Sequence, residues 1–169
     1  MTSRQPLDIP TLLWRVSLLL VISVGLVTSF ATPVLAIDYS SRSLVGEDFS
    51  GQVLTDDEFN RANLRHANFS NADLRGVKLF SANLEDANFE GANLTNATLG
   101  SARLTRTNLK NAVLEGVFAA NARFDGAIIE GADFTDVILS RNWQRKLCEV
   151  ASGSNPTTGR NTQDTLFCF

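Results

Sequence analysis

Few residues in this chain are of types that carry chemistry, and one group of them recurs at a fixed spacing. His66, Asp86 and Arg106 lie twenty residues apart, so a chain that stacks at that interval would align them in a ladder. An imidazole beside a carboxylate and a guanidinium can be tuned as a base. No nucleophile, oxyanion donor or pocket accompanies them. We therefore interpret the ladder as charge pairing on a solvated surface and expect no catalytic residues.

Cys148 and Cys168 are the two cysteines of the chain, and both lie near its C-terminal end. In an exported protein a disulfide between them is expected. Their wide separation favours a structural bond over a redox-active one, although a redox-responsive role stays open. Two cysteines and the lone His66 are too few ligands for a zinc site, and no glycine-rich phosphate loop is present, so we expect no metal and no cofactor.

Residues 1–36 have the pattern of an export signal. A start containing Arg4 is followed by an almost wholly apolar stretch, Val16–Phe30, and then by small residues that end at Ala36. This order predicts cleavage after Ala36, so that the mature chain begins at Ile37.

The alternative is a retained membrane anchor, which would be the chain's only attachment to a membrane. Leu12–Phe30 approaches the roughly 20 apolar residues that span a bilayer, but Arg15 interrupts it. Tandem arginines are absent, which favours the general secretory route. A leader rich in Ser and Arg is absent too, which favours a bacterial chain.

Composition limits the partners. The chain has 169 residues, 44% of them hydrophobic, and 15 Lys and Arg against 18 Asp and Glu. That length and hydrophobicity suit one ordinary domain. The charges are too evenly balanced for nucleic acid binding, so we expect no nucleic acid partner.

Leu or Phe recurs every five residues through the middle of the chain. The register runs from Leu44 to Leu139, with Ala119 and Ile129 as its exceptions. Two residues before most of these centres stands Ala, and the residue between is usually Asn, Asp, Lys or Arg. In an extended segment, residues i and i−2 share one side while i−1 faces the other. The pattern thus predicts a small and a large apolar side chain pointing inward in each repeat. Gly, Asn and Asp two residues after the centre indicate corners.

One repeat cannot bury its own Leu or Phe, so the repeats must wind and stack. Phe49, Phe69 and Phe89 recur every twenty residues, which predicts four repeats per coil and about five coils, with like residues stacked on like.

The repeats Ala62–His66, Ala67–Asn71 and Ala72–Gly76 resemble those of the pentapeptide-repeat family, and the resemblance covers about residues 42–141. It implies an all-β fold, a right-handed quadrilateral β-helix with four pentapeptides per coil. The first coil departs from the family pattern and is expected to act as an N-terminal cap, since larger residues replace the small one there: Arg42, Glu47, Gln52 and Asp57.

A short C-terminal helix is predicted behind the repeats. Trp143, Leu147 and Val150 are spaced as one face of a helix, with Asn142 placed to cap its start and Gly153 to end it. Such a helix would cover the open end of the last coil.

The rest of the tail is expected to return to the repeats. Leu166, Phe167 and Phe169 would pack against them, pinned by the disulfide. The predicted domains are a signal (1–36), a repeat solenoid (37–141) and a cap with a disulfide-closed tail (142–169). Signal, repeats and two-cysteine tail together resemble the thylakoid-lumen branch of the family.

One side of the predicted solenoid carries outward apolar residues. We call it the fourth face, defined by the outward positions 38, 58, 78, 98, 118 and 138 and their neighbours. Phe118 and Ile138 occupy it in successive coils, and Phe80 lies on it lower down. Clustered outward apolar side chains indicate either a surface for a protein partner or a surface that the C-terminal tail covers.

The expected function is therefore a non-catalytic scaffold or protein-interaction module outside the cytoplasm, in a cyanobacterial thylakoid lumen or a periplasm. Its partner protein and its oligomeric state are not predicted. One alternative is a redox-responsive regulator that uses Cys148 and Cys168. A further alternative comes from family members that mimic DNA and bind topoisomerases, but such mimicry needs a strongly acidic cytoplasmic protein, and this chain has a net charge of only -3.

Overall fold

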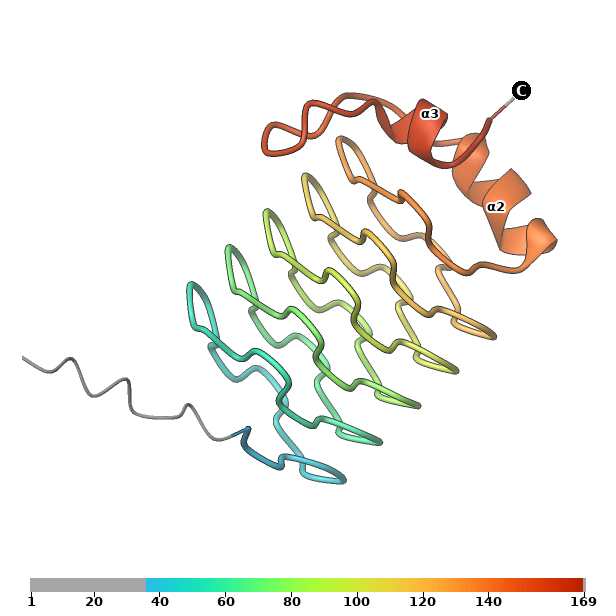
Figure 1. The fold of residues 1–169 in the computed structure, drawn as a ribbon. Coiled ribbons are helices and arrows are strands. Elements are labelled where there is room, and N and C mark those ends of the chain that lie inside the picture. Colours follow the sequence, from blue (N-terminus) through green and yellow to red (C-terminus); the bar gives the residue numbers. More distant parts are fainter. Residues whose placement is uncertain (1–35, 169) are drawn as a thin grey trace, which may run out of the picture. The chain divides into compact units, whose positions relative to one another are not determined.

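The computed structural model describes residues 36–168, which belong to one compact unit. The predicted export signal lies outside the described residues except for Ala36. Parallel β-bridges join residues twenty apart, from Asp38 with Glu58 to Phe118 with Ile138. Each coil therefore contains four five-residue repeats, and the coils stack one on another (Figure 1).

Backbone hydrogen bonds connect the repeats of successive coils. The N–H of Leu64 donates to the carbonyl of Asn83 at 2.8 Å, and the N–H of Asn83 returns to the carbonyl of Ala62 at 2.9 Å. The corners turn through left-handed residues such as His66 and Asn71, at φ 58° and 56°. Gly, Asn and Asp tolerate this conformation best, which explains their frequency at these positions.

The inward side chains form stacked columns. Phe49 and Phe69 lie with ring centroids 4.9 Å apart, and Phe69 and Phe89 follow at 4.8 Å, with nearly parallel planes in both pairs. Tyr39 continues a second column by stacking on Phe59 at 4.7 Å. Burial of these rings and of the Ala and Leu rows supplies the main stabilisation of the coils.

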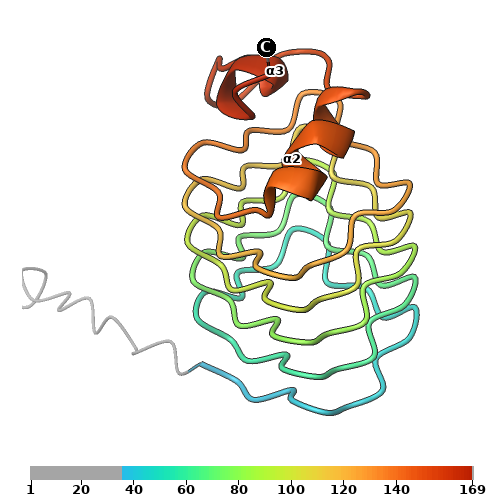
Figure 2. The same cartoon turned by 90° about the vertical axis from the view of Figure 1, so that its right-hand side faces the viewer.

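The C-terminal end of the stack is covered by two helices, α2 (Arg141–Cys148) and α3 (Thr162–Thr165) (Figure 2). Leu147 is buried and Trp143 meets the ring of Phe124 edge-on at 5.9 Å, as expected for a cap. None of the helices among residues 36–168 is long and apolar enough to cross a membrane.

Three details of the cap differ from the sequence prediction. Ser140, rather than Asn142, caps α2, because the chain is still extended at Ser140 and its hydroxyl accepts the N–H of Trp143. Val150 is 58% exposed because α2 ends before reaching it. Leu166 is buried as predicted, but Phe167 is 61% exposed, and Phe169 lies outside the described residues.

Candidate functional site

The exposed apolar residues of the fourth face lie close together at its C-terminal half. Phe80, Phe118 and Ile138 are 48%, 42% and 56% exposed. Phe118 forms a parallel bridge with Ile138 on the next coil. A Cβ atom built on Gly100 would lie 3.1 Å from Cδ2 of Phe80 and 3.1 Å from Cε1 of Phe118, so both rings close over this glycine. The result is a continuous apolar patch that spans successive coils.

The N-terminal end of the same face is charged, up to and including the coil that contains Phe80. Its outward positions hold Asp38, Glu58 and Lys78, and the ammonium group of Lys78 donates a hydrogen bond to Glu58. The hydrogen bond from Lys78 to Glu58 raises the pKa of Lys78. The fourth face therefore changes from charged to apolar along the stack.

The C-terminal tail lies against a different face, which we call the third face and define by the outward positions 53, 73, 93, 113 and 133. Asn155 is 1% exposed. Its Nδ2 donates to the backbone carbonyls of Asn111, Ala112 and Gly131 at 3.0, 3.1 and 2.9 Å. Its Oδ1 accepts the N–H groups of the turn that follows. One amide side chain thus fixes the tail to two successive coils.

Arg160 strengthens this attachment. Its Nη1 donates to Glu115 at 2.6 Å, to Asp133 at 3.1 Å and to the hydroxyl of Thr135 at 3.0 Å. The side chain of Asp133 is 0% exposed and Val113 is 7% exposed, although outward positions elsewhere face solvent. The described tail therefore covers the C-terminal part of the third face, around Val113 and Asp133, and makes these contacts away from Phe118 and Ile138.

Burial and hydrogen bonding oppose each other at Asp133. Burial acts to raise the pKa of its carboxyl, but hydrogen bonds from Thr135 and the positive charge of Arg160 outweigh burial, so the pKa is lowered from its ordinary value of 3.8. The carboxylate stays ionised and holds the tail at neutral pH.

Single exposed apolar residues occur on other faces. Ile128 is 52% exposed and Val53 is 63% exposed. Ile128 continues a row whose lower members, Asn68, Asn88 and Asn108, form a side-chain ladder. Ile128 and Val53 are as exposed as the apolar residues of the fourth face, but they lie in two different rows and do not form a patch with each other.

The His66 ladder forms as its spacing suggests. Arg106 donates to Asp86 at 2.8 and 2.7 Å and to Glu85 at 2.8 Å, while Nδ1 of His66 lies 3.9 Å from Asp86. The hydrogen bond from Arg106 lowers the pKa of Asp86. Because Arg106 occupies the carboxylate and the side chains face solvent, the geometry supports charge pairing rather than a tuned base.

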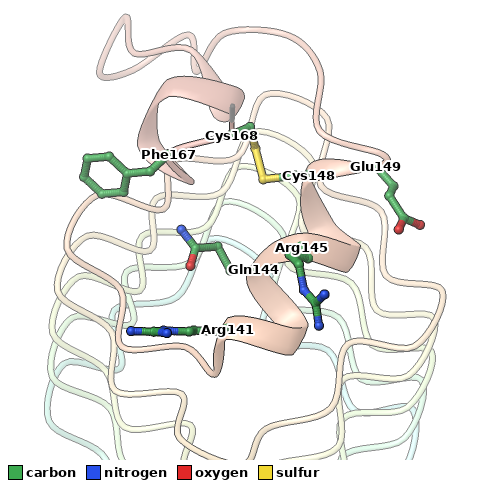
Figure 3. Close-up of a pocket in the computed structure, with 7 residues that line it drawn as sticks. All are labelled: Arg141, Gln144, Arg145, Cys148, Glu149, Phe167 and Cys168. Carbon is green, nitrogen blue, oxygen red and sulfur yellow. A yellow bond between two sulfur atoms is a disulfide. The ribbon is translucent and has the colours of Figure 1, made fainter.

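Cys148 and Cys168 form a disulfide with a Cα–Cα distance of 5.5 Å, which ties α2 to the segment after α3 (Figure 3). The bond lies beside an open groove of about 740 Å³, lined by Arg141, Gln144, Arg145, Cys148, Glu149, Phe167 and Cys168. Among residues 36–168, no three His, Cys, Asp or Glu side chains are grouped so that they could hold a metal ion.

Asn155 and Arg160 are important residues that the sequence did not reveal. The segment that contains Asn155 forms a turn, in which the N–H of Gly159 donates to the carbonyl of Asn155. The acceptors of its Nδ2 are backbone carbonyls, which have no side-chain signature in a sequence.

Comparison with known proteins decides the family. The model of pentapeptide repeats matches residues 41–71, 58–96 and 102–141, with eight copies. This chain belongs to the pentapeptide-repeat family. Pentapeptide-repeat proteins form right-handed quadrilateral β-helices, and they are generally non-enzymatic structural or interaction proteins.

Two solved pentapeptide-repeat structures are similar to this one. A protein from the thylakoid lumen of Arabidopsis thaliana is 45% identical, with a TM-score of 0.75, covering 76% of this chain and 90% of the other. A protein from Nostoc is 26% identical, with a TM-score of 0.51, covering 67% of this chain and 93% of the other.

A curated relative also comes from the thylakoid lumen. The Arabidopsis thaliana thylakoid lumenal 15 kDa protein 1, chloroplastic, is 56% identical over 36 residues. That match covers 21% of this chain and only 16% of the relative. The pentapeptide-repeat protein described here is thus related to proteins of the thylakoid lumen.

Proposed function

We propose that this pentapeptide-repeat protein is a non-catalytic scaffold outside the cytoplasm that binds a protein partner through the C-terminal half of its fourth face. The observation that carries the proposal is the closure of Phe80 and Phe118 over Gly100, with Ile138 beside them on the next coil. A contiguous apolar patch favours a protein partner, because the rings lose contact with water on binding.

A thylakoid lumen is the proposed compartment, with a periplasm as the alternative. Support comes from the likeness to the Arabidopsis lumenal protein over most of both chains and from the signal pattern of residues 1–36. Cleavage of that signal after Ala36 is part of the same proposal.

The test is affinity capture from the extracytoplasmic compartment with the intact protein and with Phe118→Asp and Ile138→Asp variants. Ile128→Asp is the matched control, because Ile128 is 52% exposed and Ile138 is 56% exposed, yet they belong to different faces. Circular dichroism checks that every variant is folded.

A captured partner is then purified, and its affinity is measured for each variant. We expect Phe118→Asp and Ile138→Asp to weaken binding at least tenfold, as central apolar contacts do, and Ile128→Asp to leave it within about twofold. Equal binding by all forms would show that the fourth face is not the binding surface.

A redox-responsive role is the second candidate, and it is favoured by the position of the disulfide beside an open groove that a reductant can reach. Titration against glutathione distinguishes the two roles. A reduction potential below about −300 mV marks a structural bond, and a higher potential supports regulation.

DNA mimicry has little support in the arrangement of charge. On the fourth face Lys78 follows Asp38 and Glu58, and on the third face Asn93 and Val113 separate Asp73 from Asp133. Neither row presents an unbroken line of carboxylates that would imitate a phosphate backbone.

A further inference from the structure

Near the N-terminal end of the stack, Asp57 places a buried carboxylate in a position that the repeats from Ala62 onward give mostly to Ala or Val. Asp57 is 3% exposed, whereas Arg42, Glu47 and Gln52 at the preceding equivalent positions are exposed. A buried carboxylate is costly unless it is hydrogen-bonded or paired with a positive charge. The partner of Asp57 therefore determines what this residue does.

That partner is the backbone nitrogen of Ile37, which lies 2.7 Å from Oδ1 of Asp57. Backbone hydrogen bonds with Glu58 hold Ile37 at this place. Its carbonyl accepts the N–H of Glu58 at 2.9 Å, and the next residue but one, Tyr39, donates to the carbonyl of Glu58 at 2.7 Å. The fold therefore places the Ile37 nitrogen beside Asp57 even while that nitrogen is an uncharged amide.

The corresponding nitrogens in later coils are bonded differently. The N–H of Asp57 donates to the carbonyl of Leu54 at 3.2 Å, and that of Val77 donates to the carbonyl of Leu74 at 3.2 Å. Each closes a corner with the residue three before it. At Ile37 the N–H instead donates to the side-chain carboxylate of Asp57, twenty residues later, which is an acceptor suited to a positive charge.

We propose that Asp57 is the binding site for the α-ammonium group that forms at Ile37 when the export signal is removed after Ala36. Hydrolysis of the Ala36–Ile37 amide consumes one water molecule, leaving a carboxylate on Ala36 and an ammonium group on Ile37. α-Amino groups are mostly protonated near neutral pH. In the processed chain a partly buried ion pair can therefore form where the uncleaved chain has only a hydrogen bond between an amide and a carboxylate.

The order of events follows from the same contacts. Both the nitrogen and the carbonyl of Ile37 are hydrogen-bonded in the folded coil, so the peptidase must act before the first coil closes. The ion pair then forms only in the processed chain. Removal of the signal therefore stabilises the N-terminal coil, which would otherwise fray as the free end of a solenoid.

The test compares two chains that differ by one residue, one beginning at Ile37 and one at Ala36. Both are released from a cleavable fusion so that no foreign residue remains. The longer chain keeps the N–H of Ile37 but moves the ammonium group away from Asp57. Each is also made with Asp57→Asn, which keeps a hydrogen-bond acceptor and removes the charge, to complete a double-mutant cycle.

Amide hydrogen exchange is the readout, since it reports the stability of the first coil separately from that of the whole protein. We expect protection of the Tyr39 and Glu58 amides to be at least tenfold greater in the chain that begins at Ile37. With Asp57→Asn the two chains should differ less than twofold. The amide of Asn83, two coils further on, should be unchanged in all four proteins and serves as the internal control.

An equal effect of the added residue in both backgrounds, or no effect in either, would overturn the proposal. Mass spectrometry of the full chain after export into a bacterial periplasm gives a second readout. A mature chain that begins at Ile37 supports the proposal, and one that begins at any other residue contradicts it. Neither result depends on partner binding at the fourth face.

Discussion

Replacement of Asn155 by Ala should detach the C-terminal tail from the third face. The side chain is 1% exposed and serves three carbonyls through Nδ2 and two N–H groups through Oδ1. Because Nδ2 carries only two hydrogens, about four full hydrogen bonds are lost. At a net value of roughly 0.5–1.5 kcal/mol each, partly recovered by water, we expect a loss of about 2–4 kcal/mol in the free energy of unfolding.

Equilibrium unfolding in urea, followed by circular dichroism, measures this loss. Asn161→Ala is the matched control, because the Asn161 side chain accepts one N–H at 2.9 Å as the N-cap of α3 and should cost only about 1 kcal/mol. Asn155→Asp should lower the free energy of unfolding more than Asn155→Ala does. It replaces the donor Nδ2 by a carboxylate oxygen, which the backbone carbonyl oxygens repel. If Asn155→Ala costs no more than Asn161→Ala, the proposed anchoring of the tail by Asn155 is wrong.

Three further predictions follow from the core and the tail. Because the folded pKa of Asp133 lies below its ordinary value of 3.8, its contribution to stability is complete above that value and is lost as the pH falls through the folded pKa; Asp133→Asn should flatten this loss in urea unfolding measured between about pH 5 and pH 2. Replacing both Cys148 and Cys168 by Ser opens a loop with a sequence separation of 20 and should lower the free energy of unfolding by about 3 kcal/mol, a loss that excess reductant should reproduce in the unmodified protein. Phe69→Ala removes the middle ring of a stacked column and should cost about 3–5 kcal/mol, and a thermal midpoint within a degree or two of the unmodified protein would contradict that role.

The repeats could be predicted from sequence because the type of each side chain, apolar or polar, indicates whether it points into the coil or toward solvent. The recurrence of Phe49, Phe69 and Phe89 gave the twenty-residue interval, which the bridges between coils show directly. The same interval placed Phe118 and Ile138 on one face. The contact of their neighbour Phe80 with Gly100 depends on side-chain conformation, which the spacing does not specify.

The cap and the tail were harder to predict for a physical reason. Ser140 and Asn142 are both good N-cap residues, and the choice between them depends on where the last coil releases the chain. The route of the tail is set by Asn155 and by Arg160, whose partners lie on coils formed by much earlier residues. Such long-range polar contacts replace the regular repeat at this end, so periodicity carries no information about them.

Because bridged residues are always twenty residues apart, the number of repeats between two points of the chain determines the angle between them about the axis of the coils. Each bridge spans twenty residues from Asp38 to Ile138, so one repeat corresponds to a quarter of a revolution about the axis of the coils. Deleting residues 83–102 would shorten the stack by one coil and leave the tail at the same azimuth. Deleting a single repeat would instead rotate α2 and everything after it by a quarter turn relative to the first coil. The stack can therefore be shortened or lengthened without rotating one end relative to the other only if whole coils of four repeats are removed or added.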